Sequence, residues 1–375
     1  IYGFRGANIG NIMSFEKDFP GAKVIRLEQN YRSTKNVLRV ADSLIKYNKE
    51  RREKDLWTEN TEGEVVEFHE FSDQEMEARF VANEIIRREE LERHRTVAIL
   101  FRVNAQSRPF EEVLVRERMP YILLGGLRFY ERMEIKEVLG YVRQIENPSD
   151  VISFRRILNV PKRGLGKVTE DKITEEGQRR GLTPSQALVA LLSRGDLGKK
   201  AEGAGRAFLR LLEGLSSKAS TLPPGDVVRM ILTDTGYSEH LQSLKTDEAE
   251  ERLDNLMELE RVASGFATIK DFLEHVALYE GADPTDIKEP HVIISTCHRA
   301  KGTEFDTVFV AGLAEGLLPH SRSMGRIEEE RRLCYVAMTR AKDTLILSYP
   351  KSVLSWDRSS KKNLSPSRFL KEAGI

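Results

Sequence analysis

The stretch "ISTCHRAKGTEFDTVFVAG" (residues 294–312) decides the fold class. It begins at the end of a short apolar strand, passes through the polar segment "CHRAKGTEF", and enters a second strand, "DTVFVAG" (306–312). Short apolar runs of this kind are typical of strands buried in a parallel sheet. In α/β proteins, polar groups at the carboxyl ends of such strands form ligand sites.

The same alternation of strands and helices runs through residues 1–125 and resumes near residue 291. Apolar segments predict strands at 23–27, 64–71, 96–102, 120–125, 291–296, 306–312 and 344–349. Amphipathic stretches at 73–93 and 108–118 predict helices between them. This pattern predicts an α/β domain with a mainly parallel sheet.

From about residue 126 to 285 the spacing of apolar residues is helical, and strand-like runs stop. The simplest interpretation is one α/β domain that is interrupted by a large all-helical insertion. We expect the two hinges of this insertion at Gly125–Gly126 and at "EGADPTDIKEP" (280–290). A helical domain on two flexible links can rotate as a body.

The chain has 375 residues, enough for two or three domains, and a formal net charge of zero. A surface for nucleic acid must therefore be local. The only cysteines, Cys297 and Cys334, predict neither a disulfide framework nor a cysteine-based metal site and suit a cytoplasmic protein. No apolar run approaches the roughly 18 residues of a membrane span. The first residues, "IYGFRGANIG", predict a cut made inside a larger protein.

Two segments carry an arginine suited to a nucleotide phosphate. In "LEQNYRST" (27–34), at a strand-to-helix turn, Tyr31 can stack on a base and Arg32 can reach a phosphate. In "EEERRLCYVAMTRAKDTLIL" (328–347), a helix predicted over 328–341 places Arg340 on an apolar face. An arginine there needs an anion, which is either a buried carboxylate in a structural ion pair or, for an arginine finger, a nucleotide phosphate.

The opening stretch adds three polar candidates. Glu304 can accept hydrogen bonds from a ribose hydroxyl, while His298 and Lys301 can meet a phosphate chain. The alternatives are a core histidine whose hydrogen bonds are satisfied and a charge at a helix end. Taken alone, His298 is more simply interpreted as a core histidine, and Glu304 as a charge at a helix end.

Two other segments suit single-stranded nucleic acid. In "IYGFRGA" (1–7), Tyr2 and Phe4 alternate with Arg5 and can stack on bases, each worth about 1–3 kcal/mol. In "FRVNAQSR" (101–108), Arg102 and Asn104 follow a strand end, where a side chain can meet a backbone phosphate. The alternatives are ordinary packing for the aromatic rings and turn chemistry for the loop.

Within the predicted insertion, "RRILNVPKRGLGKVTEDKI" (155–173) joins two helices through proline and glycine. We expect Gly164 and Gly166 to expose backbone N–H groups at a helix N-terminus, which suits a DNA phosphate. The basic residues around them are Arg155, Arg156, Lys162, Arg163 and Lys167. The segment is not a phosphate loop, because Pro161 and Val168 replace the required Gly and Ser/Thr. No such loop occurs anywhere in the chain, and no strand ends in the paired acids that hold Mg²⁺.

Five segments in this order resemble the UvrD/PcrA/Rep group of superfamily 1 DNA helicases: "IYGFRGA", "LEQNYRST", "FRVNAQSR", "STCHRAKGTEF" and "RRLCYVAMTRA". "GLRFYERMEIKEVLGYVR" (126–143) and "NVPKRGLGK" are similar to the mobile subdomain of these enzymes. The resemblance covers essentially the whole chain. It departs at Phe4, where many relatives have Trp, and at Arg299 and Thr303, where Ala and Leu are more usual.

The resemblance implies two RecA-like motor domains with ATP and Mg²⁺ between them, the first carrying the phosphate loop. Residues 1–20 would end the first motor domain. Residues 21–125 and 289–375 would form the second, a helicase-type P-loop NTPase fold without its own phosphate loop, and 126–288 the inserted helical subdomain. By similarity, Tyr31 would stack on adenine, Glu304 would bind the ribose, and Arg32 and Arg340 would contact the γ-phosphate as catalytic residues.

The resemblance also implies a path for single-stranded DNA along Tyr2, Phe4, Arg5, Arg102, Asn104 and His298, and a grip on duplex DNA around Gly164 and Gly166. The implied activity is ATP-dependent 3′-to-5′ unwinding in DNA repair or replication. Its partners would be DNA and the missing N-terminal motor domain, without which the fragment would be inactive. A non-catalytic DNA-binding or scaffolding subunit and a helicase–nuclease fusion are the alternatives.

Overall fold

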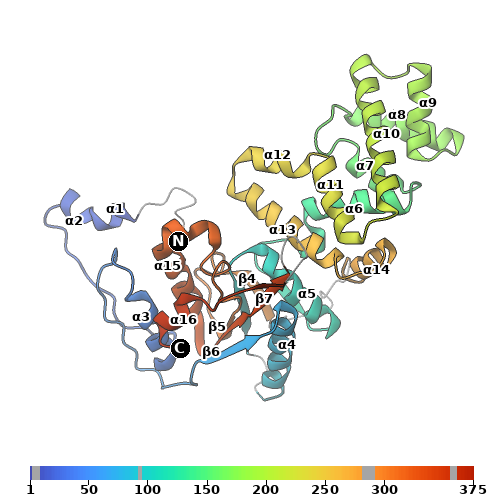
Figure 1. The fold of residues 1–375 in the computed structure, drawn as a ribbon. Coiled ribbons are helices and arrows are strands. Elements are labelled where there is room, and N and C mark those ends of the chain that lie inside the picture. Colours follow the sequence, from blue (N-terminus) through green and yellow to red (C-terminus); the bar gives the residue numbers. More distant parts are fainter. Residues whose placement is uncertain (2–8, 92–94, 281–291, 355–360) are drawn as a thin grey trace. The chain divides into compact units, whose positions relative to one another are not determined.

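The computed structural model describes residues 1, 9–91, 95–280, 292–354 and 361–375. The chain forms two compact units, drawn in Figure 1. Unit 1 comprises Ile1–Leu127 and Asp283–Ile375, and unit 2 comprises Arg128–Ala282. The predicted α/β fold with a large helical insertion is therefore confirmed. The predicted stacking residues Tyr2, Phe4 and Arg5 lie outside the described residues.

Unit 1 contains a six-stranded sheet in which all neighbouring strands are parallel. The strands are β1 (Glu67–Phe71), β2 (Val97–Phe101), β3 (Tyr121–Leu123), β4 (Val292–Thr296), β5 (Phe305–Val310) and β6 (Ala341–Pro350). Their order across the sheet is β1-β6-β5-β2-β4-β3, so unit 2 is inserted between two adjacent strands, β3 and β4. A separate antiparallel pair follows, β7 (Ser352–Leu354) and β8 (Lys361–Asn363).

Helices cover both faces of this sheet and make three layers (Figure 1). One face packs against α3 (Lys35–Ile45), α15 (Ile327–Met338) and α16 (Arg368–Ala373), and the other against α4 (Gln74–Leu91) and α5 (Ser107–Arg116). Along β2, Ala98 and Leu100 enter the first core, whereas Ile99 and Phe101 enter the second. Both faces are buried, which explains why the strands are continuous apolar runs.

Two predicted elements differ from the structure. Residues 23–27 form no strand and follow the short helices α1 (Gly10–Met13) and α2 (Phe15–Asp18). Their side chains are exposed, Leu27 to 77%, because no strand in the described part of the chain pairs with them. The helix predicted over 328–341 ends at Met338, because the backbone turns into β6, where the Arg340 carbonyl accepts from Phe305 N at 2.9 Å.

The described part of unit 2 contains only helices, α6 to α14, and one 3₁₀ turn at Phe129–Glu131. At its centre is α6, whose Ile135, Val138, Leu139 and Tyr141 are fully buried. The helices are α6 (Met133–Glu146), α7 (Val151–Ile157), α8 (Lys167–Arg180), α9 (Pro184–Arg194), α10 (Lys199–Ala219), α11 (Pro224–Asp234), α12 (Tyr237–Leu244), α13 (Asp247–Ala263) and α14 (Ile269–Tyr279). Of the helices that the structure describes, none has the length and apolar character needed to cross a bilayer.

Within unit 1, Glu77 on α4 is a fully buried carboxyl group that joins this helix to the sheet. Its Oε1 accepts hydrogen bonds from Gly312 N at 2.9 Å and from Ser348 Oγ at 2.7 Å. Burial raises the pKa of Glu77 from 4.5 to about 7, against the opposing effect of these two hydrogen bonds. The folded protein therefore holds a proton on Glu77 at pH values where the unfolded chain does not.

We predict that the free energy of unfolding of unit 1 falls as the pH rises from about 4.5 to about 7. The folded state binds one more proton than the unfolded state in this window, and the difference corresponds to about 3 kcal/mol in total. Glu77→Gln should abolish this contribution and make the protein more stable than the wild type at pH 8. The measurement is urea unfolding at several pH values, followed by the fluorescence of the two tryptophans, Trp57 and Trp356, both in the sequence of unit 1.

Glu89→Gln on the same helix serves as the control, because Glu89 is exposed and should leave the pH dependence unchanged. An identical pH slope in the wild type and in Glu77→Gln would contradict the assignment.

Candidate functional site

The candidate residues of unit 1 lie at two opposite edges of the sheet. Arg102 follows β2 and His298 lies in the turn region that follows β4, and these two strands pair in parallel. Both residues are therefore at the edge where the strands end. Glu304 precedes β5 and Arg340 precedes β6, which also pair in parallel, so these two residues are at the edge where the strands begin.

This arrangement corrects one expectation from the sequence. Glu304 was expected with His298 at the carboxyl ends of strands, but the connection 297–304 carries the chain back across the sheet. Its Cys297 and Ala300 are fully buried against the face that also packs on α15. The two edges are separated by the length of a strand, which for the six residues of β5 is about 20 Å.

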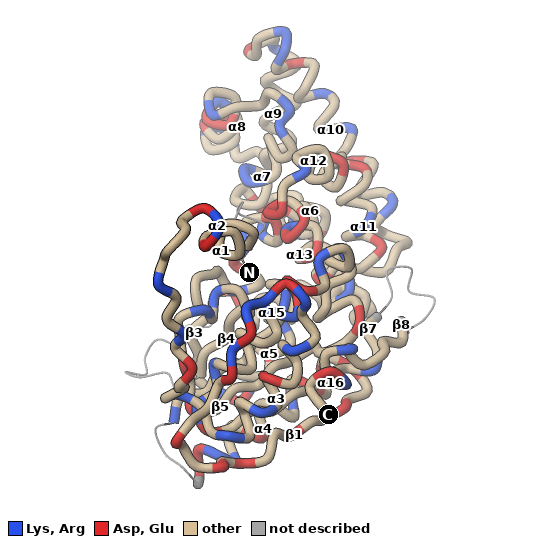
Figure 2. The backbone as a smooth tube through the Cα atoms, turned by 90° about the vertical axis from the view of Figure 1, so that its left-hand side faces the viewer, with Lys and Arg blue, Asp and Glu red and all other residues tan. Residues whose placement is uncertain are grey.

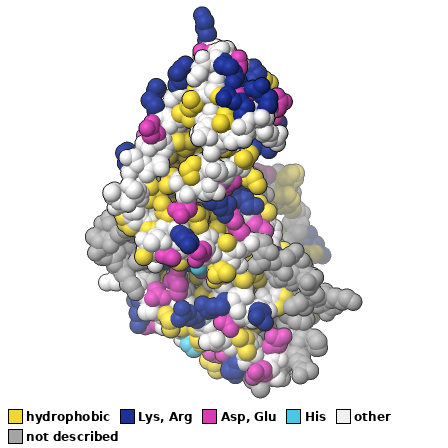
Figure 3. Space-filling view, turned by 90° about the vertical axis from the view of Figure 1, so that its right-hand side faces the viewer, with side chains coloured by type: hydrophobic (Ala, Val, Ile, Leu, Met, Phe, Trp, Pro, Cys, Tyr) yellow, Lys and Arg dark blue, Asp and Glu magenta, His cyan; other side chains and the backbone are white. Residues whose placement is uncertain are grey.

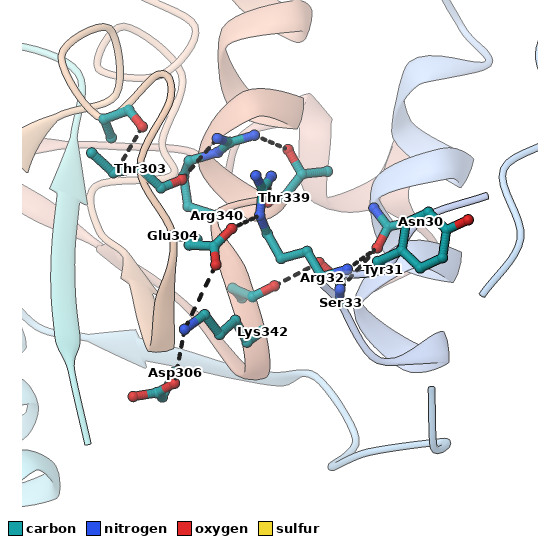
Figure 4. Close-up of polar contacts among 12 residues, drawn as sticks. Asn30, Tyr31, Arg32, Ser33, Thr303, Glu304, Asp306, Thr339, Arg340 and Lys342 are labelled. Carbon is teal, nitrogen blue, oxygen red and sulfur yellow. Dashed lines mark hydrogen bonds and ion pairs between the residues drawn. The ribbon is translucent and has the colours of Figure 1, made fainter. Parts of the chain in front are cut away.

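The loop that holds Tyr31 and Arg32 is fixed by two asparagines. Asn30 Oδ1 accepts hydrogen bonds from the backbone N–H groups of Arg32 and Ser33, both at 2.8 Å. From the other side, Asn60 Nδ2 donates to the carbonyls of Tyr31 and Ser33 at 3.3 and 3.2 Å. Tyr31 is 78% exposed, and its side chain is drawn in Figure 4.

Arg32 reaches from this loop to the amino edge of the sheet. Its Nε forms an ion pair with Glu304 Oε2 at 2.7 Å, and its Nη1 donates to the Thr339 carbonyl at 3.3 Å (Figure 4). The hydrogen bond from Arg32 is the main reason that the pKa of Glu304 is lowered. Lys342 Nζ lies 3.8 Å from the other oxygen of Glu304, so this carboxylate has two cationic neighbours.

Arg340 lies beside Arg32 and is held by uncharged oxygens. Its Nε donates to the Val336 carbonyl at 3.0 Å and its Nη1 to the Thr303 carbonyl at 2.8 Å. Burial, followed by the nearby charge of Arg32, lowers the pKa of Arg340 to about 10. The buried ion pair that was the alternative for Arg340 is absent from the described part of the chain. A half-buried cation next to a second cation is a site that favours an anion.

At the carboxyl edge, Arg102 is engaged by a carboxylate. Its guanidinium makes a bidentate ion pair with Glu330 of α15, with the shortest distance 2.8 Å between Nη2 and Oε1. Gln106 Oε1 accepts from the backbone N–H groups of Arg102 and Val103, so turn chemistry does shape this loop. Asn104 begins the 3₁₀ turn Asn104–Gln106 in the same loop. A phosphate at this edge would have to compete with Glu330 for Arg102.

In unit 2, the backbone of the glycine loop is closed by Asn159. Its Oδ1 accepts from the N–H groups of Arg163, Gly164 and Leu165, at 2.7, 3.0 and 3.3 Å. The expectation that Gly164 exposes its backbone N–H is therefore wrong, because a side-chain oxygen already accepts from it. The guanidinium of Arg163 also turns inward, donating to the Ile157 and Val160 carbonyls and to the Tyr141 hydroxyl.

Gly166, Lys162 and Lys167 of this predicted DNA site are also exposed. Gly166 is the N-cap of α8, and no side chain caps that helix. Lys167 forms ion pairs with Glu170 and Asp171 at 3.3 and 2.8 Å, and acidic residues lie among the basic ones along α8 (Figure 2). In Figure 3, Lys and Arg side chains lie close together at the upper end of the view, over the helical unit.

Reasoning from the sequence missed several residues that shape these sites. Asn30 could have been found from the preference of asparagine for turns. No sequence pattern pointed to Asn60, Glu330 or Asn159, because each forms hydrogen bonds with residues that their spacing in the sequence does not identify. Lys342, two residues after Arg340, was also not predicted as a neighbour of Glu304. The described residues bring together no group of three His, Cys, Asp or Glu side chains that could hold a metal ion.

Comparison with known proteins supports the resemblance in the sequence. The family model "UvrD-like helicase C-terminal domain" matches residues 25–193 and 209–352. The chain is 42% identical to the ATP-dependent DNA helicase PcrA of Bacillus subtilis (strain 168), an alignment that covers 99% of this chain and 52% of that protein. It is 41% identical to DNA helicase II of Rickettsia typhi, covering 94% of this chain and 55% of that protein.

PcrA of Staphylococcus aureus (strain Mu50) is 40% identical, with 99% of this chain and 52% of that protein covered. The chain thus spans about half the length of the curated relatives it matches. The expected resemblance is confirmed, and the chain belongs to the UvrD-like helicase family, whose C-terminal domain it matches.

Proposed function

We propose that this chain is part of an ATP-dependent 3′-to-5′ DNA helicase and supplies the second half of its ATP site. The observation that carries the proposal is the pairing of Arg340 with Arg32 at the amino edge of the sheet. Arg340 is half-buried with only uncharged hydrogen-bond partners, and Arg32 adds a second positive charge beside it. A triphosphate offers the concentrated negative charge that such a pair favours.

The other side chains of this edge fit the remaining parts of ATP. The exposed ring of Tyr31 stacks on adenine, and Glu304 accepts hydrogen bonds from the ribose. Glu304 forms an ion pair with Arg32. Arg32 therefore has to leave this ion pair before its guanidinium can contact the γ-phosphate of ATP. Lys342, 3.8 Å from Glu304, remains to balance the carboxylate. ATP and its Mg²⁺ supply the phosphoryl chemistry and are held mainly by another domain, since this chain has no phosphate loop.

Exposed apolar side chains in the segment that precedes β1 indicate that another domain packs there. Ile12, Phe19, Ile25 and Leu27 are each between 58% and 77% exposed, on a segment that pairs with no strand in the described chain. Several large apolar side chains exposed along one short segment are typical of a surface that another structure covers. We propose that the first motor domain of the same protein covers them and brings its phosphate loop to Arg32 and Arg340.

DNA is the proposed substrate. At the carboxyl edge, Arg102, Asn104 and His298 would contact single-stranded DNA, together with Tyr2, Phe4 and Arg5. In unit 2, the exposed start of α8 at Gly166, with Lys162 and Lys167, would contact a duplex phosphate, while Arg163 and Gly164 shape the loop from within. Alternating closure and opening of the ATP site would move the protein along one strand, in DNA repair or replication.

The proposal predicts that a full-length protein containing this chain unwinds a duplex with a 3′ tail when ATP and Mg²⁺ are present, whereas the chain by itself hydrolyses no ATP. The measurements are strand separation with 3′-tailed and 5′-tailed substrates, and phosphate release with and without DNA. DNA binding by the full-length protein without hydrolysis would instead identify a scaffolding subunit. ATP turnover by the chain alone would refute the division of the site between two domains.

Arg340→Ala in the full-length protein should lower kcat for DNA-stimulated ATP hydrolysis by about 10³-fold or more, the range found for arginine fingers. The reason is that the guanidinium stabilises charge that develops in the transition state, so KM should change much less than kcat. Steady-state kinetics at saturating DNA provides the measurement. Arg87→Ala is the matched control, because Arg87 is an exposed arginine on α4 that pairs only locally with Glu84. An unchanged kcat for Arg340→Ala would exclude the finger role.

Gly166→Asp should weaken duplex binding without unfolding α8. A side chain at Gly166 meets no atom within 4 Å, and aspartate is a favourable N-cap, so the helix should gain roughly a few tenths of a kcal/mol. Its charge repels a phosphate at the same place. Gly166→Asn is the matched control, since asparagine caps equally well without charge. Fluorescence anisotropy with a 3′-tailed duplex over a salt series measures the difference. Equal affinities of the Asp and Asn variants would place the duplex phosphate elsewhere.

A further inference from the structure

Helix α15 runs from one edge of the sheet to the other. Glu330, in its first turn, meets Arg102 at the carboxyl edge, and Arg340, just beyond its last turn, lies at the amino edge. From Glu330 to Thr339 the helix rises roughly 14 Å. The helix is therefore a direct connection between the proposed DNA edge and the proposed ATP edge.

At its start, the helix is joined to Arg102 through the carboxylate of Glu330. Both oxygens of Glu330 bond Arg102, and Oε2 also accepts from the His320 backbone N–H at 2.9 Å. The side chain of Glu330 is only 4% exposed, whereas that of Arg102 is 17% exposed. The arginine is thus the partner that solvent and a ligand can reach.

At its end, the helix touches both arginines of the ATP edge. The Val336 carbonyl accepts from Arg340, and the Thr339 carbonyl accepts from Arg32. The Thr339 hydroxyl also accepts from Arg340 Nη2 at 3.3 Å. Any displacement of the last turn therefore moves the acceptors that orient these two guanidinium groups.

Between its ends, α15 is packed as one rigid body. Leu333, Cys334, Ala337 and Met338 are all at most 1% exposed and belong to the core on this face of the sheet. Packed interiors shift between discrete arrangements and do not deform continuously. A shift at the first turn is therefore transmitted to the last.

We propose that Glu330 is a positioning residue that couples a DNA phosphate at Arg102 to the placement of Arg32 and Arg340. This inference rests on the proposed helicase function and adds to it a specific route between the two edges. A phosphate that binds Arg102 competes with Glu330 for the guanidinium. The buried carboxylate then loses its main partner, which is strongly unfavourable unless α15 shifts and Glu330 finds other donors. By linkage, ATP bound at the other edge changes DNA affinity to the same extent.

The test is Glu330→Gln in the full-length protein. The amide keeps the size of the side chain and can accept from the His320 N–H, but without a charge it competes far less with a phosphate for Arg102. We expect the affinity for an oligothymidylate to rise by about 5-fold or more, while the stimulation of ATP turnover by saturating DNA falls by about 10-fold. A purely structural role predicts the opposite sign for DNA affinity, because damage to the fold weakens binding.

Glu328→Gln is the matched control, since Glu328 lies in the same turn and also accepts backbone N–H groups, those of Lys49 and Glu50. It should leave both quantities unchanged. If Glu330→Gln does not fold, Arg102→Lys takes its place, because it keeps a charge for DNA but cannot form the bidentate pair. Reduced stimulation at saturating DNA would support the coupling, and wild-type stimulation would overturn it.

The failure of this inference can be distinguished from failure of the proposed function. A wild-type protein whose ATP turnover does not respond to DNA would refute the function itself. A wild-type protein that responds normally, together with unchanged affinity and stimulation in Glu330→Gln, would refute only the role of Glu330.

Discussion

Parallel strands can pair only if every connection between them crosses back over the sheet, and this constraint organises both candidate sites. Each of the six strands begins at one edge and ends at the other. Residues that follow strands, such as Arg102 and His298, therefore gather at one edge. Residues that precede strands, such as Glu304 and Arg340, gather at the other. Two sites about a strand's length apart follow from the direction of the strands alone.

The amino edge has a charge arrangement that suits an incoming anion. Arg32 is neutralised by Glu304, but Arg340 bonds only carbonyls and a hydroxyl. The same carboxylate is the proposed ribose acceptor, so nucleotide and Arg32 compete for it. The carboxyl edge has a similar arrangement, because Glu330 forms an ion pair with Arg102, the arginine that a DNA phosphate would contact. In both places an internal carboxylate forms an ion pair with an arginine that the proposed ligand would contact.

Much of the fold was readable from the sequence, because strands buried on both faces are continuous apolar runs and the insertion has helical spacing throughout. The strand predicted at 23–27 failed since its apolar residues have no neighbouring strand in the described chain. Arg32, before α3, and Arg340, after α15, could be identified as site residues from their motifs, but their positions relative to each other could not be predicted. Glu304 was assigned to the wrong edge because eight residues without a helix carry the chain across the sheet. Asn159 and Glu330 were missed because their roles depend on contacts that only the folded chain creates.

The position of unit 2 between β3 and β4 has a consequence for how such a protein can evolve. These strands are adjacent and parallel, so a crossover must connect them whatever its length. A dozen or so residues would suffice for that connection, and an ordinary α/β protein would use one helix. Unit 2 therefore occupies a position where an entire domain can be gained, exchanged or lost without altering the order of a single strand. The α/β unit and the unit inserted in it can diversify independently, as long as the chain leaves at one edge and returns at the other.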